Sequence, residues 1–301
     1  MRKDSINIRK ARRADAVLLG VTVIWGGTFS IVHGALENIS PLLFIGLRFM
    51  VGCLVFLPFT IRSLRKVTRK TLYSGIVLGM LLGTGFVLQT IGLDITTASK
   101  SAFITGTLVI LTPIFQLVIE KRIPQFGNIL GVGIVAVGLY FLTMPEGSSL
   151  NLGDLLTFGC AIAFALYVVV LDLFTTARFE PALVFIQMSV TALIGLVGAA
   201  FLETSRFEPD MSLLWAILYT GVLATTVTTY LQTRYQRETT PTRAAIIFSF
   251  EPVFAAMIAV FLFHEHLPFL SYMGGGIIVI GLLVSELWTS AQKPGAASPP
   301  T

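Results

Sequence analysis

The sequence predicts an all-α integral membrane protein whose ten transmembrane helices form two inverted five-helix repeats. Three observations predict this fold: the composition, the number of long apolar segments, and a weak internal repeat. Of the 301 residues, 12% are charged and 54% are hydrophobic, and the mean hydropathy is +0.84. An average soluble domain is about 25% charged. A chain with so few charged side chains cannot coat its surface in water, which excludes cytosolic enzymes, disulfide-rich secreted domains and nucleic-acid-binding modules.

Ten apolar segments are long enough to cross a bilayer, whose hydrocarbon core of about 30 Å needs about 20 helical residues. Proline stands at the start of two of them, Pro41 and Pro181, where its missing N–H costs a helix little. Gly75, Gly79 and Gly83 recur on one face of the third segment, a spacing that lets a neighbouring helix pack closely. The expected spans are 14–35, 41–61, 71–93, 98–119, 125–143, 154–173, 181–202, 212–232, 242–263 and 267–288.

The basic residues indicate how these spans are oriented. Alternate connections, beginning with the basic N-terminal segment 1–13, carry nearly all of the 21 lysines and arginines. The connections on the other side carry only Lys100 and Arg206, while Arg48 lies within a span. Because basic residues are retained in the cytoplasm, we expect both termini there and the protein in the cell (inner) membrane. The C-terminal segment 289–301, with its prolines and small residues, is expected to be a disordered tail.

The two halves of the chain, 14–143 and 154–288, resemble each other weakly at an offset of 143 residues. Leu88-Gln89-Thr90 returns as Leu231-Gln232-Thr233, Thr96-Thr97 as Thr239-Thr240, and Ser99-Lys100 as Thr242-Arg243. The offset corresponds to five spans, an odd number, so the two copies enter the membrane in opposite directions. Inverted repeats are the architecture of secondary transporters, which bind substrate near the midplane where the repeats meet. The alternative is chance similarity between apolar helices, and the matching polar residues in the connections argue against it.

Short motifs mark several of the predicted spans. They are Trp25-Gly26-Gly27-Thr28-Phe29 in the first, Leu47-Arg48-Phe49 in the second, Thr96 to Ala102 opening the fourth, Ala163 to Tyr167 in the sixth, and Phe250-Glu251-Pro252-Val253-Phe254 followed by His264-Glu265 in the ninth. With these motifs, residues 14–288 resemble the ten-helix EamA-type permeases of the drug/metabolite transporter (DMT) superfamily. The resemblance implies a secondary transporter that moves a small metabolite, such as an amino acid or a related compound, by alternating access.

The resemblance is specific for the family and not for a substrate. The superfamily includes exporters of amino acids, other metabolites and toxic compounds, together with some importers. Export of a small metabolite is therefore our leading expectation, and an importer or a lipid-linked sugar flippase of the same superfamily is the alternative. His264 departs from the pattern, because such permeases often have a small residue at that place.

Two ionisable residues lie at membrane depth, Arg48 about 10 Å and Glu251 about 14 Å inside their nearer boundaries. Such residues are costly in lipid, so each should face a partner or a water-filled space. As functional groups, Arg48 would anchor an anion or carboxylate, and Glu251 would bind an amine or a proton. As structural groups, Arg48 would cap helix-end carbonyls or pair internally, and Glu251 would stabilise a kink at Pro252. An ion pair between Arg48 and Glu251 is a further alternative.

Further polar and aromatic residues fall near the midplane and are candidates for lining a substrate cavity with hydroxyl donors and aromatic walls. Packing or lipid contact is the ordinary alternative for each of them. With Arg48 and Glu251, the predicted cavity residues are Trp25, Thr28, Tyr167, Thr225, Thr226 and Phe248. Three glutamines are expected in gating or interhelical hydrogen bonds, namely Gln89, Gln116 and Gln232.

The rival functions are an intramembrane enzyme and a channel. The chain has no H-E-x-x-H metal pair and no G-x-S-x-G nucleophile turn, and His264-Glu265-His266 is expected in a solvated connection. We therefore expect no catalytic residue, metal or cofactor, and as partners a small-molecule substrate and the lipid bilayer, not nucleic acid. A channel needs an open pore, which the inverted repeats disfavour. Because two inverted halves complete a transport unit, we expect a monomer, with a dimer as the alternative.

Overall fold

The computed structural model describes residues 8–143, 150–175, 181–204, 206–263 and 268–291. Ten of its helical stretches are long and apolar enough to cross a membrane, which confirms the expected all-α membrane fold. The helices are α1 (Ile8–Gly26), α2 (Thr28–Ala35), α3 (Pro41–Leu64), α4 (Arg69–Ile95), α5 (Ala98–Gly106), α6 (Leu108–Glu120), α7 (Phe126–Thr143), α8 (Leu152–Thr175), α9 (Pro181–Leu202), α10 (Met211–Leu218), α11 (Thr228–Tyr235), α12 (Pro241–Phe248), α13 (Glu251–Phe263) and α14 (Phe269–Ala291). A π-helical segment, η1 (Tyr219–Val227), joins α10 to α11, and a short 3-10 turn, η2 (Gln236–Glu238), follows α11.

The ends of the spans differ from expectation in a few places. The helix α14 continues to Ala291, so the first three residues of the expected tail are helical, and the remainder of the tail lies outside the described residues. The helix α3 runs to Leu64 and α4 begins at Arg69, with the Thr68 hydroxyl accepting a hydrogen bond from the backbone N–H of Thr71. A side-chain N-cap of this kind replaces a missing backbone partner at the start of a helix. The connection between these two helices, residues 65–68, is short.

Four spans are not single regular helices. The first breaks at Gly27, between α1 and α2, and the eighth contains the π-helical segment η1. The fourth breaks at Thr107 and the ninth at Ser249–Phe250, and Thr107 and Phe250 are 143 residues apart. At the second of these breaks Pro252 has no N–H to donate to the carbonyl of Phe248, so α12 ends there. The two breaks are equivalent in the two halves of the chain.

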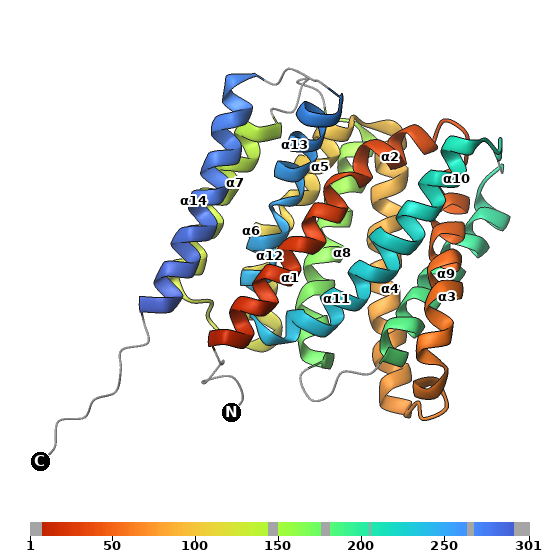
Figure 1. Ribbon diagram of the computed structural model, residues 1–301, viewed down its shortest axis with the longest axis horizontal. Coiled ribbons are helices and arrows are strands. Elements are labelled where there is room, and N and C mark those ends of the chain that lie inside the picture. The colour runs from red at the N-terminus through yellow and green to blue at the C-terminus, as the bar shows by residue number, and fades with distance from the viewer. Residues whose placement is uncertain (1–7, 144–149, 176–180, 205, 264–267, 292–301) are drawn as a thin grey trace, which may run out of the picture.

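The helices pack in pairs that the repeat exchanges (Figure 1). The helix α7 lies along α14, and α3 lies along α9, so that each of these pairs joins equivalent spans of the two halves. The contact of α4 with α8 corresponds to that of α11 with α1, and the contact of α6 with α8 corresponds to that of α13 with α1. The fold is therefore two five-helix repeats that pack against each other with opposite orientation.

Glycines let the two repeats approach closely. A Cβ built on Gly75 or Gly79 would lie 2.6 Å from a side-chain carbon of Ile186 or Val190 in α9, and one on Gly83 would lie 2.7 Å from Ile194. The glycine face of α4 thus packs on a helix of the same chain. At Gly195 the approach is to backbone, because an added Cβ would lie 2.5 Å from the nitrogen of Gly46 in α3.

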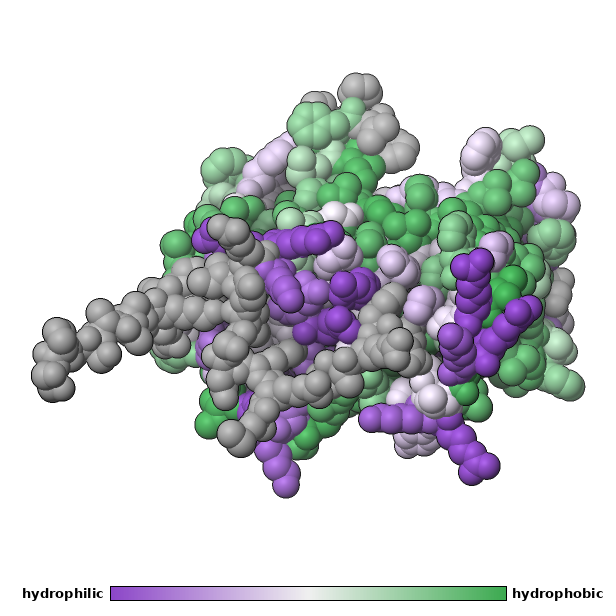
Figure 2. Space-filling view, turned by 60° about the horizontal axis from the view of Figure 1, so that its bottom comes forward, coloured by the Kyte–Doolittle hydropathy of each residue, from purple (hydrophilic) through white to green (hydrophobic). Residues whose placement is uncertain are grey.

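The surface has the pattern of a multi-pass membrane protein. The start of α1 and the end of α14 lie at the same end of the bundle, the lower end in Figure 1, here called the terminal face. Hydrophilic residues gather on this face and hydrophobic residues surround it (Figure 2). Large apolar side chains such as Phe59 (76% exposed) and Phe261 (72%) cover the flanks. Exposed basic residues lie in the connection between α3 and α4 and at the adjoining helix ends, namely Arg62, Arg65, Lys66, Arg69 and Lys70.

Candidate functional site

A cavity lies inside the bundle where the two repeats meet. Its empty volume is about 850 Å³, a figure that includes the space open to solvent at its mouth. Seven of the ten spans contribute to its wall, while α7, α9 and α14 do not. The lining residues are Trp25, Thr28, Phe29, Val32, Arg48, Leu82, Phe86, Gln89, Thr90, Leu93, Thr105, Leu108, Phe164, Tyr167, Val168, Ala224, Thr229, Gln232, Phe248 and Glu251.

The cavity lies on the axis that relates the repeats. Several lining residues form pairs separated by the repeat offset of 143, so that both equivalent positions face the same space. These pairs are Trp25 and Val168, Phe86 and Thr229, Gln89 and Gln232, Thr105 and Phe248, and Leu108 and Glu251. Only the glutamine pair has the same side chain in both copies. The repeat therefore builds one cavity whose two halves differ in chemistry.

Arg48 brings a positive charge into this cavity from α3. Its side chain is 3% exposed, and its Nε donates a hydrogen bond to the hydroxyl of Thr225 at 3.1 Å. The guanidinium carbon lies 4.7 Å from the ring centre of Phe86 and 5.4 Å from that of Phe49, in the range of cation–π contacts. No carboxylate of the described residues forms an ion pair with Arg48, and Thr225 bonds only its Nε.

Glu251 brings a carboxyl group into the same cavity. It is the first residue of α13, directly after the break at Ser249–Phe250, and the positive end of the helix dipole favours a carboxylate there. Its side chain forms no hydrogen bond or ion pair with any residue that the structure describes. An ion pair between Arg48 and Glu251 was one alternative from the sequence, and these two side chains form no such pair. Both residues border the cavity.

Trp25 is held at the break between α1 and α2. Its Nε1 donates to the carbonyl of Ala224 at 3.2 Å, and its ring meets Phe248 edge-on at 5.4 Å between centres. The hydroxyl of Tyr219 in η1 donates to the carbonyl of Ile24 at 2.7 Å, and the hydroxyl of Thr28 to that of Trp25 at 2.8 Å. Carbonyls near the break thus gain side-chain donors. The broken first span and the π-helical segment together fix the position of the indole.

Tyr167 lines the cavity with its ring and not with a free hydroxyl. The hydroxyl donates to Oε1 of Gln187 at 3.0 Å, and Nε2 of Gln187 donates to the hydroxyl of Thr233 at 3.0 Å. Gln187 is fully buried. This chain of hydrogen bonds joins α8, α9 and α11. It satisfies groups whose burial without partners would be costly, and the sequence analysis did not include Gln187 among the candidates.

Two residues that were predicted to line the cavity, Thr225 and Thr226, do not line it. Thr225 stands behind Arg48 as its hydrogen-bond acceptor. The hydroxyl of Thr226 donates to the carbonyls of Gly52 and Gly221 at 3.1 and 2.9 Å, so Thr226 joins α3 to η1. Depth along a helix placed these two threonines at the right level, and the direction of each side chain put them elsewhere. Gln116, which was expected in gating or interhelical hydrogen bonds, accepts a hydrogen bond from the hydroxyl of Thr242 at 2.6 Å and joins α6 to α12.

The other two glutamines border the cavity. Nε2 of Gln89 lies 3.4 Å from the hydroxyl of Thr105, and Nε2 of Gln232 donates to Oε1 of Gln236 at 3.0 Å. Sequence reasoning missed part of the aromatic wall, where Phe86 meets Phe49 and Phe164 edge-on at 5.1 and 5.2 Å between ring centres. The repeat offset was a usable signal for it, because Phe86 lies 143 residues before Thr229, a polar residue of the second repeat.

The described part of the chain offers no cluster of three or more His, Cys, Asp or Glu side chains that could hold a metal ion. His264-Glu265-His266 lies outside the described residues. What the cavity offers is the guanidinium of Arg48, the carboxyl group of Glu251, amide and hydroxyl groups, and aromatic walls. Such a set can bind a small polar molecule.

Comparison with known proteins decides the family. Residues 12–144 and 151–287 each match the EamA-like transporter family. The chain belongs to this family. Membership makes the protein a membrane transporter of the DMT superfamily, as its motifs implied.

This EamA-like transporter has relatives along nearly its whole length. It is 34% identical over 274 residues to an uncharacterized transporter of Archaeoglobus fulgidus, covering 91% of this chain and 86% of the relative. It is 26% identical over 291 residues to the uncharacterized transporter YoaV of Bacillus subtilis, covering 92% and 97%. A solved structure called "Crystal structure of protein" has a TM-score of 0.77 at 15% identity, covering 94% of this chain and 99% of the other. At that identity the likeness shows the fold alone.

Proposed function

We propose that this EamA-like transporter moves a small zwitterionic metabolite, such as an amino acid or a related compound, by alternating access. One observation carries the proposal: Arg48 and Glu251, one basic and one acidic residue, border one cavity and have no ion-pair partner among the described residues. A charge at membrane depth is costly unless a partner or water compensates it. A substrate with a carboxylate and an ammonium group supplies both missing partners.

The neutral residues support a substrate with an apolar or aromatic side chain. Trp25, Phe86, Phe164 and Phe248 form walls on several sides of the cavity. Gln89 and Gln232 place amide groups at equivalent positions in the two repeats. A few polar groups that fix orientation, set among apolar walls, are typical of small-molecule sites.

The remaining parts of the proposal concern the setting. The basic residues on the terminal face support a cytoplasmic location of both termini in the cell (inner) membrane. We propose export, from the terminal face to the opposite face, in keeping with many members of the superfamily. Because one chain supplies every lining residue of the cavity, we propose a monomer as the transport unit.

Purified protein in liposomes tests the substrate class. Radiolabelled zwitterionic amino acids with aromatic or large aliphatic side chains are compared with their amides, which lack the carboxylate, and with the corresponding hydroxy acids, which lack the amine. We expect uptake of at least one zwitterion, and uptake at least about tenfold slower for both analogues, because each loses a charge-assisted hydrogen bond. Equal transport of an amide or a hydroxy acid contradicts a zwitterion site.

The same liposomes test ion coupling, and cells and membrane vesicles test the direction of transport. Imposing a pH gradient shows whether proton flow drives uptake, and loss of that response in Glu251→Gln assigns the proton to Glu251. Uptake that ignores the gradient makes the protein a facilitator or couples it to another ion. Comparison of intact cells with inverted membrane vesicles distinguishes export from import.

A further inference from the structure

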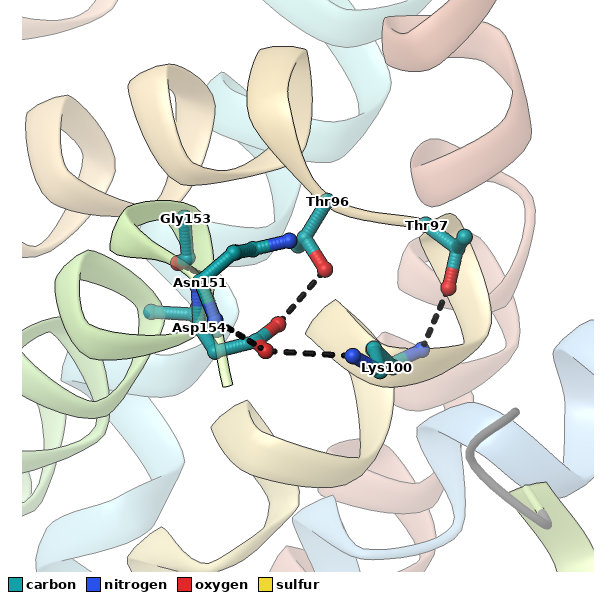
Figure 3. Close-up of polar contacts among 7 residues, drawn as sticks. Thr96, Thr97, Lys100, Asn151, Gly153 and Asp154 are labelled. Atoms are coloured by element: carbon teal, nitrogen blue, oxygen red, sulfur yellow. Dashed lines mark hydrogen bonds and ion pairs between the residues drawn. The ribbon is translucent and has the colours of Figure 1, made fainter. Parts of the chain in front are cut away.

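A buried ion pair joins the two repeats at the face opposite the termini. The carboxylate of Asp154, in the first turn of α8, accepts hydrogen bonds from the hydroxyl of Thr96 at 2.6 Å and from Nζ of Lys100 at 3.2 Å. Figure 3 shows these side chains converging from the end of α4, from α5 and from α8. The side chains of Lys100 and Asp154 are 11% and 3% exposed, so the pair is largely shielded from solvent. It connects the first repeat to the second.

A second buried ion pair joins the repeats at the terminal face. Nε and Nη2 of Arg243, in α12, donate to Oδ2 of Asp15, in α1, at 3.0 and 2.6 Å. The two side chains are 10% and 17% exposed. Here the basic residue comes from the second repeat and the acidic residue from the first, whereas in the Lys100–Asp154 pair the basic residue comes from the first repeat. Arg243 also lies 4.0 Å from Glu286 of α14, so this pair belongs to a wider charge network.

The two ion pairs occupy equivalent places in the inverted repeat. Lys100 and Arg243 are 143 residues apart, and each follows a threonine N-cap. The backbone N–H of Lys100 donates to the hydroxyl of Thr97 at 3.3 Å, and the backbone N–H of Arg243 donates to the hydroxyl of Thr240 at 3.3 Å. Asp15 and Asp154 are 139 residues apart. The difference of four residues is about one helical turn, so the two carboxylates stand on corresponding faces of equivalent spans. Inversion puts one pair at each face of the bundle.

We propose that Lys100–Asp154 and Arg243–Asp15 are the two opposed latches of the transport cycle, one closing each face. The inference rests on the proposed alternating access. When one repeat rocks against the other, the helices between them separate at one face and close at the other. Opening toward the face opposite the termini separates α5 from α8 and breaks Lys100–Asp154, while Arg243–Asp15 holds. Opening toward the terminal face reverses the two.

The latches differ in their surroundings. At the Lys100–Asp154 latch the backbones of α4 and α8 touch, since a Cβ on Gly92 would lie 2.9 Å from the carbonyl oxygen of Gly153. At the other latch the position equivalent to Gly92 is Tyr235, whose hydroxyl accepts a hydrogen bond from Arg13 at 3.2 Å.

Each latch stabilises the states in which it is formed. Removing one latch must therefore shift the populations of the two states in a known direction.

Thiol labelling of the cavity tests the sign of that shift. Cys53 and Cys160 are replaced by alanine and a single cysteine replaces Leu82, which lines the cavity in the middle of α4. A membrane-impermeant thiol reagent is applied to right-side-out and to inverted membrane vesicles, and the ratio of the two labelling rates reports which face is open. The measurement needs no substrate, so the latch proposal and the zwitterion proposal fail independently.

We expect Asp154→Asn to change this ratio by about tenfold in favour of the face opposite the termini, and Asp15→Asn by a similar factor in favour of the terminal face. Lys100→Gln breaks the same ion pair as Asp154→Asn and should shift the ratio in the same direction. Arg243→Gln breaks the same ion pair as Asp15→Asn and should also shift the ratio as that variant does. The swapped variant Lys100→Asp/Asp154→Lys should return the ratio toward that of the parent.

The control is Glu238→Gln, which breaks the 2.9 Å ion pair with Arg234 within one helix end and joins no repeats. It should leave the ratio unchanged. Folding of every variant is followed by its melting temperature and its elution as a single species. Variants that melt earlier with an unchanged ratio, or that shift it in one common direction, overturn the proposal and leave the ion pairs as stabilising contacts only.

Discussion

Arg48 and Glu251 both border the cavity, and no ion pair joins them. Arg48 is supported by Thr225 and by the faces of two phenylalanines, which hold a guanidinium without cancelling its charge. Glu251 is supported by its place at the start of α13. A carrier binds its substrate reversibly, and groups left unpaired by the protein are those that a substrate can pair with.

The two charges predict complementary variants. Arg48→Met should remove the preference for a substrate carboxylate, so that transport of the zwitterion falls to the level of its amide. Glu251→Gln should remove the preference for the amine, so that transport of the zwitterion falls to the level of its hydroxy acid. Each loses a charge-assisted contact worth about 1.5–3 kcal/mol, or at least about tenfold in uptake efficiency. Concentration dependence of uptake in liposomes measures both.

Matched controls for these variants exist elsewhere in the chain. Arg62→Met removes an exposed arginine from the same helix as Arg48, and Glu208→Gln removes an exposed glutamate outside the cavity. Both should transport as the parent does. If Arg48→Met and Glu251→Gln weaken all three substrates equally, the charges serve structure and not substrate recognition.

At the scale of elements, close helix packing depends on which glycines face backbone. Gly195 of α9 meets the backbone of Gly46 in α3, where an added Cβ would lie 2.5 Å from nitrogen and 2.8 Å from Cα. Backbone atoms of two long helices cannot yield as the end of a side chain can. The helix α3 contributes Arg48 to the cavity wall, so the packing of α9 on α3 also helps to position the site.

Gly195→Ala should therefore lower the free energy of unfolding by about 1–3 kcal/mol, the usual cost of overpacking. The matched control is Gly133→Ala in α7, where a Cβ meets nothing within 4 Å. There the helix-favouring alanine should be neutral or stabilise by about 0.5–1 kcal/mol. Thermal unfolding in detergent, followed by the amount that still elutes as a single species, compares the two. A neutral Gly195→Ala contradicts the described helix contact.

For the whole molecule, orientation in the membrane is the property that connects the cavity to a direction of transport. In a background without Cys53 and Cys160, single cysteines replace Lys66, in the connection between α3 and α4, and Glu208, in the connection before α10. Both positions are exposed, and an odd number of spans separates them. A membrane-impermeant maleimide added to intact cells should label position 208 and leave position 66 unlabelled until the cells are opened. Reversed labelling places both termini outside.

Much of the architecture was predictable because lipid imposes it. Backbone groups in hydrocarbon must be satisfied within the chain, so long apolar segments become helices, and their number follows from counting. The repeat was also visible, since Gln89 and Gln232, or Thr97 and Thr240, are polar residues conspicuous among apolar ones. The placement of the breaks was less visible: only the ninth span carries a proline next to its break.

Ten membrane-spanning helices, two repeated halves and the ionisable groups at membrane depth can be read from the sequence alone. Other features follow only from how the helices pack: Arg48 and Glu251 border one cavity unpaired, Thr226 joins α3 to η1 and does not line the cavity, and Lys100 and Arg243 meet carboxylates of the opposite repeat. The reason is that burial in lipid is a property of each segment alone. The partner of a side chain depends on the rotation and packing of whole helices, which residues far apart in the chain set together.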